Sequence, residues 1–104
     1  MSATYGVDRK KWAQLDIFNQ MGNIYSEVGR SFKGSGSDRE KAIARAIDLF
    51  DATTESLAKT KSPKLKEVLR AKEEFLNLVS RPERKKSEIN SLDTYFLQFA
   101  IAAR

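Results

Sequence analysis

The chain has no cysteine and no histidine among its 104 residues. Without cysteine it has no disulfide framework, no thiolate nucleophile and no thiolate zinc site. Without histidine it lacks the commonest general base and the usual side-chain ligand of transition metals. We therefore expect a protein that is not an enzyme and that requires no metal or cofactor.

Long apolar runs are also missing. No stretch approaches the roughly 20 apolar residues that a helix needs to span a bilayer. The N-terminus does not carry the apolar segment of a signal peptide. These two absences predict a cytoplasmic protein without a membrane partner.

Charged side chains are abundant, and positive ones are in excess. The 19 lysines and arginines outnumber the 14 aspartates and glutamates, so the formal net charge is +5. A hydrophobic content of 40% is typical of a globular chain, and one domain of this length buries roughly two-thirds of its unfolded surface. The positive excess either serves solubility or marks a surface that binds polyanions.

Apolar residues recur at three- and four-residue spacing in four segments, which predicts four helices. The first is expected to start at Asp8, its N-cap, and to run to about Phe32, after a flexible tail of residues 1–7. The second is expected to begin with a capping box, in which the side chains of Ser37 and Glu40 each accept a hydrogen bond from a backbone N–H of the first turn.

The remaining helices have start signals of their own. The second helix is expected to end near residues 59–61. Ser62 and Pro63 then form an N-cap followed by proline at the first helical position, and Ser87 caps the last helix. No segment alternates with period two, so the sequence predicts an all-α chain. Helices joined by short loops pack antiparallel to their neighbours, which favours an antiparallel up-down four-helix bundle over residues 8–104.

Residues 34–36 read Gly-Ser-Gly and predict a flexible linker between the first two helices. A phosphate-binding loop is the alternative, because such loops precede helices. The segment follows a helix rather than a strand, however, and lacks the Gly-Lys-Ser/Thr ending of a P-loop. A linker is the better interpretation, and its composition suits a natural or an engineered loop.

Two predicted helices are more apolar than a monomeric bundle requires. At 100° per residue, Leu97 and Ile101 point away from the core face of the last helix, and a helix that is apolar nearly all round is usually buried all round. The first helix has a broad apolar arc with two glycines that would let another helix approach: Leu15, Ile17, Gly22, Ile24 and Gly29. Isolated exposed aliphatics are also ordinary surface features. We favour a homo-oligomer whose interface contains Leu97 and Ile101.

A row of acids on the second predicted helix invites comparison with a carboxylate metal site. Asp48, Asp51 and Glu55 lie close together, but a di-iron bundle would add histidine ligands from facing helices. The sequence contains none. We therefore expect a solvated face in which these acids are interleaved with Arg45 and Lys59.

Lys72 falls within the apolar stripe of the third predicted helix, between Val68 and Phe75. A lone buried ammonium group is costly. The side chain is therefore expected either to extend to solvent or to pair with a carboxylate of another helix, for which Glu27 is the candidate.

The up-down topology would gather positive side chains at the two ends of the bundle. One end receives Arg9, Lys10, Lys11, Lys59, Lys61, Lys64, Lys66 and Arg104, and the other receives Lys33, Arg39, Lys41, Arg81, Arg84, Lys85 and Lys86. Clusters of this kind bind phosphate backbones, although loop ends are charged in most proteins. The candidate nucleic-acid-binding residues are Arg9, Lys10, Lys11, Lys59, Lys61, Lys64, Lys66, Arg84, Lys85 and Lys86. Only Tyr5 and Trp12 are aromatic near the first cluster, so stacking on bases should be scarce.

Several segments resemble a family of small four-helix proteins from microbial genomes. They are residues 19–30 (NQMGNIYSEVGR), 45–51 (RAIDLFD), 65–70 (LKEVLR), 95–99 (YFLQF) and 102–104 (AAR). This family is similar to the 23S rRNA intervening-sequence proteins and to the accessory variability determinant of diversity-generating retroelements. The resemblance spans about residues 12–104.

The resemblance implies a basic homopentameric barrel that binds the RNA of the element and its reverse transcriptase. It implies no catalytic residue. It places Glu27, Arg30 and Arg104 at motif positions, where a structural polar network and a binding network are equally compatible. The Gly-Ser segment departs from the family, for which we expect a longer charged connection.

Two functions follow for the whole chain. The leading hypothesis is a non-enzymatic nucleic-acid-binding accessory protein, with RNA as the favoured nucleic acid and a reverse transcriptase as a further partner. The alternative is a protein–protein scaffold or adaptor bundle with no nucleic-acid role, in which the charge only aids solubility. The sequence leaves the identity of the partner and the number of subunits open.

Overall fold

The computed structural model describes residues 6–80 and 86–102, the last four of these by their backbone alone. Within these ranges the chain forms five helices and no strand, so the all-α prediction is confirmed. The helices are α1 (Arg9–Ala13), α2 (Ile17–Lys33), α3 (Gly36–Lys59), α4 (Leu65–Ser80) and α5 (Lys86–Ala102). None of the described helices is both long enough and apolar enough to cross a membrane.

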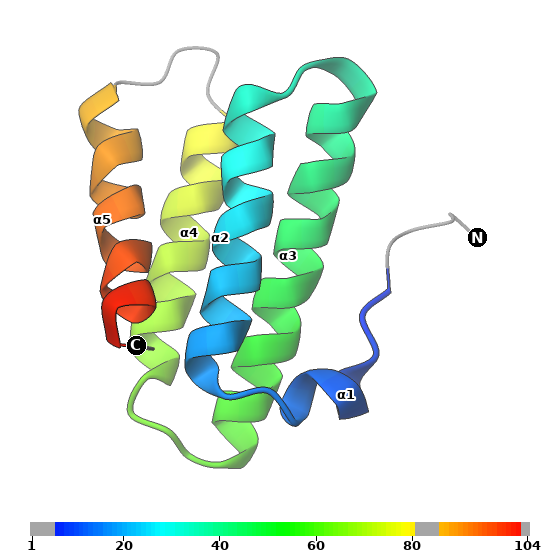
Figure 1. Cartoon of the computed structure of the whole chain (residues 1–104), viewed down its shortest axis with the longest axis vertical. Coiled ribbons are helices and arrows are strands. Elements are labelled where there is room, and N and C mark those ends of the chain that lie inside the picture. The colour runs from blue at the N-terminus through cyan, green and yellow to red at the C-terminus, as the bar shows by residue number, and fades with distance from the viewer. Residues whose placement is uncertain (1–5, 81–85, 103–104) are drawn as a thin grey trace.

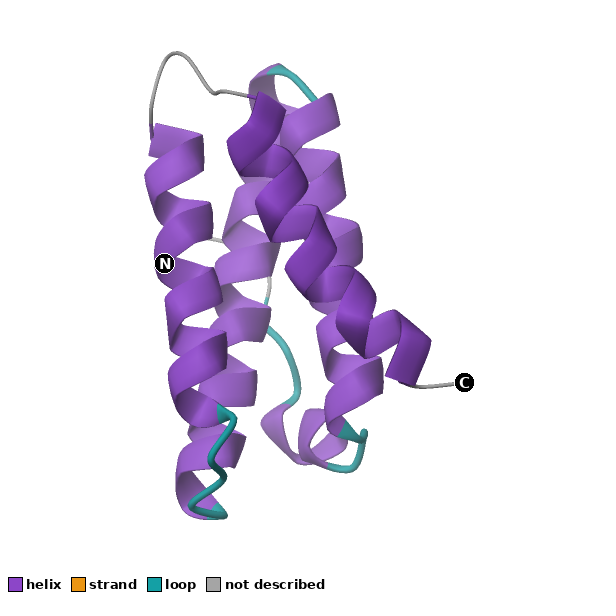
Figure 2. Cartoon of the chain, turned by 90° about the vertical axis from the view of Figure 1, so that its left-hand side faces the viewer, coloured by secondary structure: helices purple, strands orange, loops and turns teal. Residues whose placement is uncertain are grey.

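The four long helices run alternately up and down (Figure 1). Helix α2 lies between α3 and α5, and α4 contacts the same two helices from the other side. The most extensive contact is that between α2 and α3. Figure 2 shows that α5 is inclined to the other long helices, and its packing against α4 is less extensive than the packing of α2 on α3.

The first predicted helix is in fact two helices, so the prediction of one continuous helix is wrong. Asp8 caps α1 as predicted, because its carboxylate accepts hydrogen bonds from the backbone N–H groups of Lys10 and Lys11. A second cap follows at Asp16, whose carboxylate accepts the N–H of Asn19 at 2.8 Å. Asp16 directly before an apolar stretch was a helix-start signal in the sequence.

The break between α1 and α2 lets Trp12 enter the core. The indole is 6% exposed, and its Nε1 donates to Oγ1 of Thr53 on α3 at 2.9 Å. The side-chain amide of Gln20 donates to the carbonyl oxygens of Trp12 and Leu15, each at 3.0 Å. These bonds satisfy carbonyl groups that a continuous helix would have paired. A large aromatic side chain is thereby buried with its N–H satisfied.

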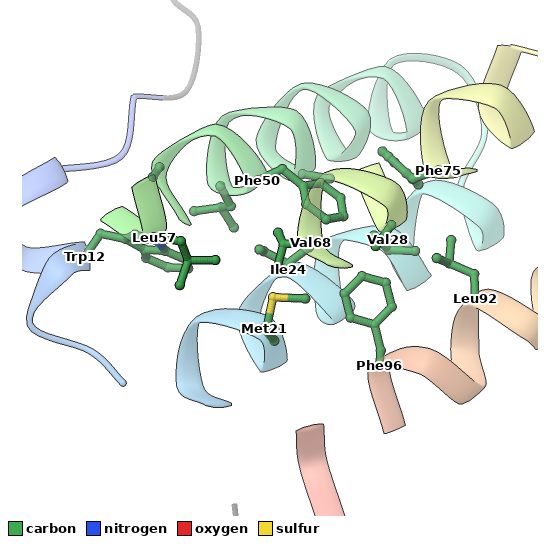
Figure 3. Close-up of a cluster of buried hydrophobic side chains, with 14 of the residues drawn as sticks. Trp12, Met21, Ile24, Val28, Phe50, Leu57, Val68, Phe75, Leu92 and Phe96 are labelled. Atoms are coloured by element: carbon green, nitrogen blue, oxygen red, sulfur yellow. The ribbon is translucent and has the colours of Figure 1, made fainter. Parts of the chain in front are cut away.

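The core lies between the long helices and is rich in aromatic rings (Figure 3). Its fully buried large side chains come from all four long helices: Met21, Ile24, Val28, Phe50, Val68, Phe75, Leu92 and Phe96. Phe50 links the layers, because its ring centroid lies 6.0 Å from that of Phe75 and 6.1 Å from that of Phe96. Val68 and Phe75 belong to the predicted apolar stripe of the third helix, whereas Ile24 was expected in the broad outer arc of the first predicted helix.

The Gly-Ser segment is a two-residue connection between α2 and α3, not the predicted open linker. A Cβ on Gly34 would lie 2.9 Å from the carbonyl oxygen of Arg30, which backbone atoms cannot accommodate without moving. Gly36 has a φ angle of +58°, a conformation that glycine adopts without steric cost. The predicted capping box is wrong, because α3 begins at Gly36 with Ser35 as its N-cap, and Ser37 lies inside the first turn.

The starts of the last two helices differ from their predictions by a few residues. The hydroxyl of Ser62 accepts the N–H of Lys64 at 3.2 Å, but α4 begins at Leu65, two residues after Pro63. Helix α5 begins at residue 86, so Ser87 lies within its first turn rather than before it.

Candidate nucleic-acid interface

The positive side chains of α1 and of the α3–α4 turn lie at the same end of the molecule. Figure 1 shows α1 and this turn together at the lower end, where α3 ends and α4 begins. We name this surface the lysine end, and it consists of Lys10, Lys11, Lys59, Lys61, Lys64 and Lys66. All of these side chains are exposed except that of Lys64, which is half-buried.

The α3–α4 turn holds Lys61 in a backbone conformation that favours glycine, with a φ angle of +54°. The N–H of Lys61 donates to the carbonyl of Ala58 at 3.2 Å, and that of Ser62 donates to the carbonyl of Leu57 at 2.9 Å. Helix α3 therefore ends in a Schellman motif in which lysine occupies the usual glycine position. The sequence did carry a signal for this motif, because Pro63 follows two residues later.

Replacing Lys61 with glycine should stabilise the protein by roughly 1 kcal/mol, because the left-handed conformation costs an ordinary residue about that much. The free energy of unfolding in urea measures this effect. Lys59→Gly is the matched control, since it removes the same charge from a helical position and should destabilise the protein by up to about 1 kcal/mol. A loss of stability in Lys61→Gly would contradict this account of the turn.

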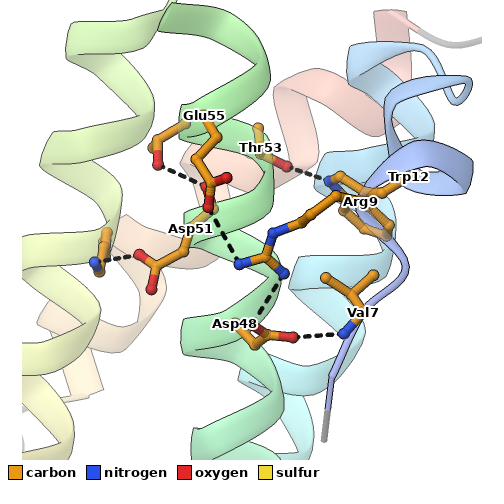
Figure 4. Close-up of polar contacts among 9 residues, drawn as sticks. Val7, Arg9, Trp12, Asp48, Asp51, Thr53 and Glu55 are labelled. Carbon is orange, nitrogen blue, oxygen red and sulfur yellow. Dashed lines mark hydrogen bonds and ion pairs between the residues drawn. The ribbon is translucent and has the colours of Figure 1, made fainter.

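Arg9, one of the predicted binding residues, is engaged within the chain (Figure 4). Its guanidinium donates to Asp48 at 3.0 Å and to Glu55 at 3.2 Å, and the N–H of Val7 donates to Asp48 at 2.8 Å. Burial lowers the pKa of Arg9, but the hydrogen bonds and charges of Asp48 and Glu55 outweigh burial, so the pKa is raised above its ordinary value. Arg9 thus fixes the N-terminal segment on α3, including residue 7 of the predicted tail.

The acids on α3 are partly exposed, as expected of a solvated face, and each also has a partner in another segment. Asp48 and Glu55 bind Arg9. Nζ of Lys72 on α4 donates to Oδ1 of Asp51 at 2.5 Å and forms an ion pair with it. The candidate pairing of Lys72 with Glu27 is therefore wrong. Glu27 is instead bonded to Arg30 on its own helix at 2.9 Å.

The Lys72–Asp51 pair should contribute little to stability, because the side chains are 25% and 41% exposed. We expect Lys72→Met to change the free energy of unfolding by less than about 1 kcal/mol, and a double-mutant cycle with Asp51→Asn to give a coupling energy of the same small size. Urea unfolding of the two single variants and the double variant measures both values. Glu27→Gln combined with Lys72→Met is the control and should be additive. A loss of several kcal/mol in Lys72→Met would show instead that Asp51 is effectively buried.

The opposite end of the molecule also carries positive side chains. Lys86, at the start of α5, is exposed. Arg39 has a structural contact, because its guanidinium donates to the carbonyl of Val79 at 3.0 Å and so ties α3 to α4. The predicted binding residues Arg84 and Lys85 lie outside the described part of the chain.

The predicted oligomer interface is described only in part. Leu97 is 50% exposed on α5, and the side chain of Ile101 lies outside the described residues. On α2, Ile24 is buried in the core, which removes it from the broad arc. A Cβ on Gly22 or on Gly29 would meet nothing within 4 Å, so no other described segment packs closely there.

The aromatic residues that we considered for stacking at the lysine end do not provide an exposed platform there among the described residues. Trp12 is buried against α3. Tyr5 lies outside the described residues. Tyr95 of α5, which is half-buried, lines a pocket together with Lys66 of this end.

The chemistry available to a ligand at the lysine end is concentrated positive charge, which suits phosphate groups. Among the residues that the structure describes, no group of three acidic side chains is placed to hold a metal ion. On α5, burial and the charge of Glu67 raise the pKa of Tyr95 to about 12, so its phenol stays protonated at neutral pH. Comparisons of the chain with models of protein families, with curated proteins and with solved structures find no match.

Proposed function

We propose that the chain is a non-enzymatic nucleic-acid-binding accessory protein whose lysine end binds the phosphate backbone of RNA. The observation that carries this proposal is the lysine at position 61, in a left-handed conformation where glycine would be more stable. Residues held in strained conformations are concentrated at functional sites. The strained residue here is Lys61, whose exposed side chain lies at the same end as the five other lysines.

The architecture that supports this function is an antiparallel four-helix bundle preceded by the short α1. We propose that it assembles into a homo-oligomer through the outer face of α5, where Leu97 is half exposed. A ring of subunits would repeat the lysine end around one axis and add its phosphate contacts together. The family resemblance adds a pentameric ring, the RNA of a diversity-generating retroelement and its reverse transcriptase as the specific partners.

The test of the proposed function is the salt dependence of binding to a structured RNA. If about six lysines neutralise phosphates, the affinity should fall on a log–log plot with a slope of about −0.7 to −0.9 per contact. Between about 50 and 200 mM salt this amounts to a loss of roughly a thousandfold. Fluorescence anisotropy of a labelled RNA measures the slope. An RNA of unrelated sequence is the control and should bind similarly, because aromatic platforms are scarce.

Salt-independent binding, or no binding at low salt, would contradict the proposed function. The alternative, an adaptor bundle that binds a protein through an apolar surface, would then take its place. Its exposed apolar side chains are Leu15, Leu69 and Leu97.

A further inference from the structure

Four positive side chains from two helices converge on a groove between α2 and α3, at the end opposite the lysine end. The groove has a volume of about 460 Å³ and is lined by Arg30 and Lys33 of α2 and by Lys41 and Arg45 of α3. Among the described residues, Asp38 is the one acidic side chain in its lining. The lining therefore carries three more positive than negative charges.

This concentration of charge follows from the short α2–α3 connection. The backbone approaches itself closely at Gly34, which also lines the groove, so the last turn of α2 lies against the first turns of α3. Lys41 and Arg45 are four residues apart on one helix, where like charges repel each other. An anion in the groove would lie beside both positive side chains.

Arg30 has hydrogen-bonding capacity beyond its intrahelical partner. Its Nη1 donates to Glu27 at 2.9 Å, and its side chain is 65% exposed. A guanidinium has five N–H donors in a planar fork, which matches the oxygens of a phosphate group. Arg30 can therefore bind a phosphate without giving up Glu27.

A second groove lies on the other side of Arg30 and Lys33, between α2 and α5. It has a volume of about 550 Å³, and the same two positive residues line it together with one acid, Asp93, and with Tyr25, Phe32 and Ile89. Gly29 also lines it, and a Cβ on Gly29 would meet nothing within 4 Å. The second groove thus offers aromatic and aliphatic contacts directly beside the positive charges of the first.

We propose that the two grooves together bind a nucleoside phosphate across α2. The phosphate group lies in the α2–α3 groove, between Arg30, Lys41 and Arg45. The base lies in the α2–α5 groove beside Tyr25 and Phe32, over the space that Gly29 leaves open. The volumes of both grooves fall within the usual range of about 300–1,000 Å³ for small-molecule sites. This site uses none of the lysine end and does not depend on RNA binding there.

The first test compares three probes by isothermal titration calorimetry: adenosine 5′-monophosphate, inorganic phosphate and adenosine. The monophosphate should bind at least about tenfold more tightly than either of the others, because base stacking and phosphate contacts each contribute at least that much. Equal binding of the monophosphate and inorganic phosphate would overturn the base position. Equal binding of the monophosphate and adenosine would overturn the phosphate position.

Variants then separate the two grooves. Lys41→Glu with Arg45→Glu should weaken binding of the monophosphate by about tenfold or more and leave binding of adenosine unchanged. Asp38→Asn removes a negative charge and should strengthen binding of the monophosphate. Gly29→Leu should lower the affinity for the monophosphate to that for inorganic phosphate. Its matched control is Gly22→Leu, since Gly22 also faces open space but does not line the groove. Light scattering of both glycine variants distinguishes a loss of binding from a change in oligomeric state. Unchanged binding of the monophosphate in the Lys41/Arg45 variant would overturn the proposal.

A nucleoside phosphate can be free or part of a single strand, and a tetranucleotide distinguishes these sources. Tighter binding of the tetranucleotide than of the monophosphate, with the same response to Gly29→Leu, assigns the site to single-stranded nucleic acid. Tighter binding of the monophosphate assigns it to a free nucleotide. Charge reversal at Lys10 and Lys11 should not change binding of the monophosphate, so this site and the lysine end can fail independently.

Discussion

Charge reversal to glutamate at Lys10, Lys11, Lys61 and Lys64 is expected to weaken binding to a structured RNA by at least about a thousandfold at 0.1 M salt. In the counterion-release description each lost phosphate contact removes about 0.9 of a decade of affinity at that salt concentration, so four contacts account for this factor. The new carboxylates add repulsion. The slope of the log–log salt plot should become correspondingly shallower.

Folding of the reversal variant has to be shown separately. Three of the four side chains are exposed and Lys64 is half-buried, so the helix content in circular dichroism should stay close to that of the parent. Reversal at Arg84, Lys85 and Lys86 tests the other predicted cluster, of which the structure describes Lys86, with a similar change in charge. If both reversal variants bind RNA as tightly as the parent at 0.1 M salt, the nucleic-acid proposal is wrong and the adaptor alternative should replace it.

Substitution of Leu97 with aspartate, together with Ile101→Asp, is expected to convert an oligomer into a monomer. Burying a leucine at an interface contributes roughly 1.5–3 kcal/mol per subunit, and a carboxylate in the same place would have to be desolvated without a partner. Light scattering should return the mass of one chain, 11.8 kDa, for the variant and a multiple of that mass for the parent.

Leu69→Asp is the matched control for the interface prediction. Leu69 is 42% exposed on α4, a level similar to the 50% of Leu97, but it lies on a different helix. The control should keep the mass of the parent. A parent mass of 11.8 kDa at micromolar concentration would remove the oligomer proposal, and dissociation of the control as well would show that the interface is elsewhere.

Assembly into an oligomer would also change the affinity of the lysine end for RNA. One copy of the end offers six lysines, and several copies around an axis would bind one RNA through linked contacts. Such linkage raises overall affinity without any new contact in the subunit. A monomeric Leu97 variant should therefore bind RNA more weakly than the parent even though its lysine end is intact.

Much of the helical organisation could be predicted from the sequence, because helix formation is governed by neighbours three and four residues apart. The apolar stripe that contains Val68 and Phe75 predicted residues that the structure buries completely. The cap at Asp8 was also correct, since its hydrogen bonds reach only two and three residues along the chain. The break before Asp16 was missed because the apolar pattern of α2 extends back toward Trp12, and periodicity alone does not show where the chain turns.

The candidate site was less predictable, since its composition depends on contacts between distant residues. The sequence identified the lysines of one end but gave no reason to separate Arg9 from them. Arg9 is engaged by Asp48 and Glu55, 39 and 46 positions away. The groove between α2 and α3 was also missed, because Arg30 and Arg45 belong to different helices and have no shared sequence motif.

The sequence by itself determined that this chain is helical, many of the residues that form its core, and that it carries an excess of positive charge without histidine or cysteine. Those properties depend on side-chain type and on spacing within one turn or two. The tertiary structure alone decided which charges are brought together. Lys72 forms an ion pair with Asp51 rather than with Glu27. Arg30, Lys41 and Arg45 line one groove. The physical reason is that ion pairs form over a few ångströms, so they depend on the rotation and axial register of whole helices, which local sequence does not specify.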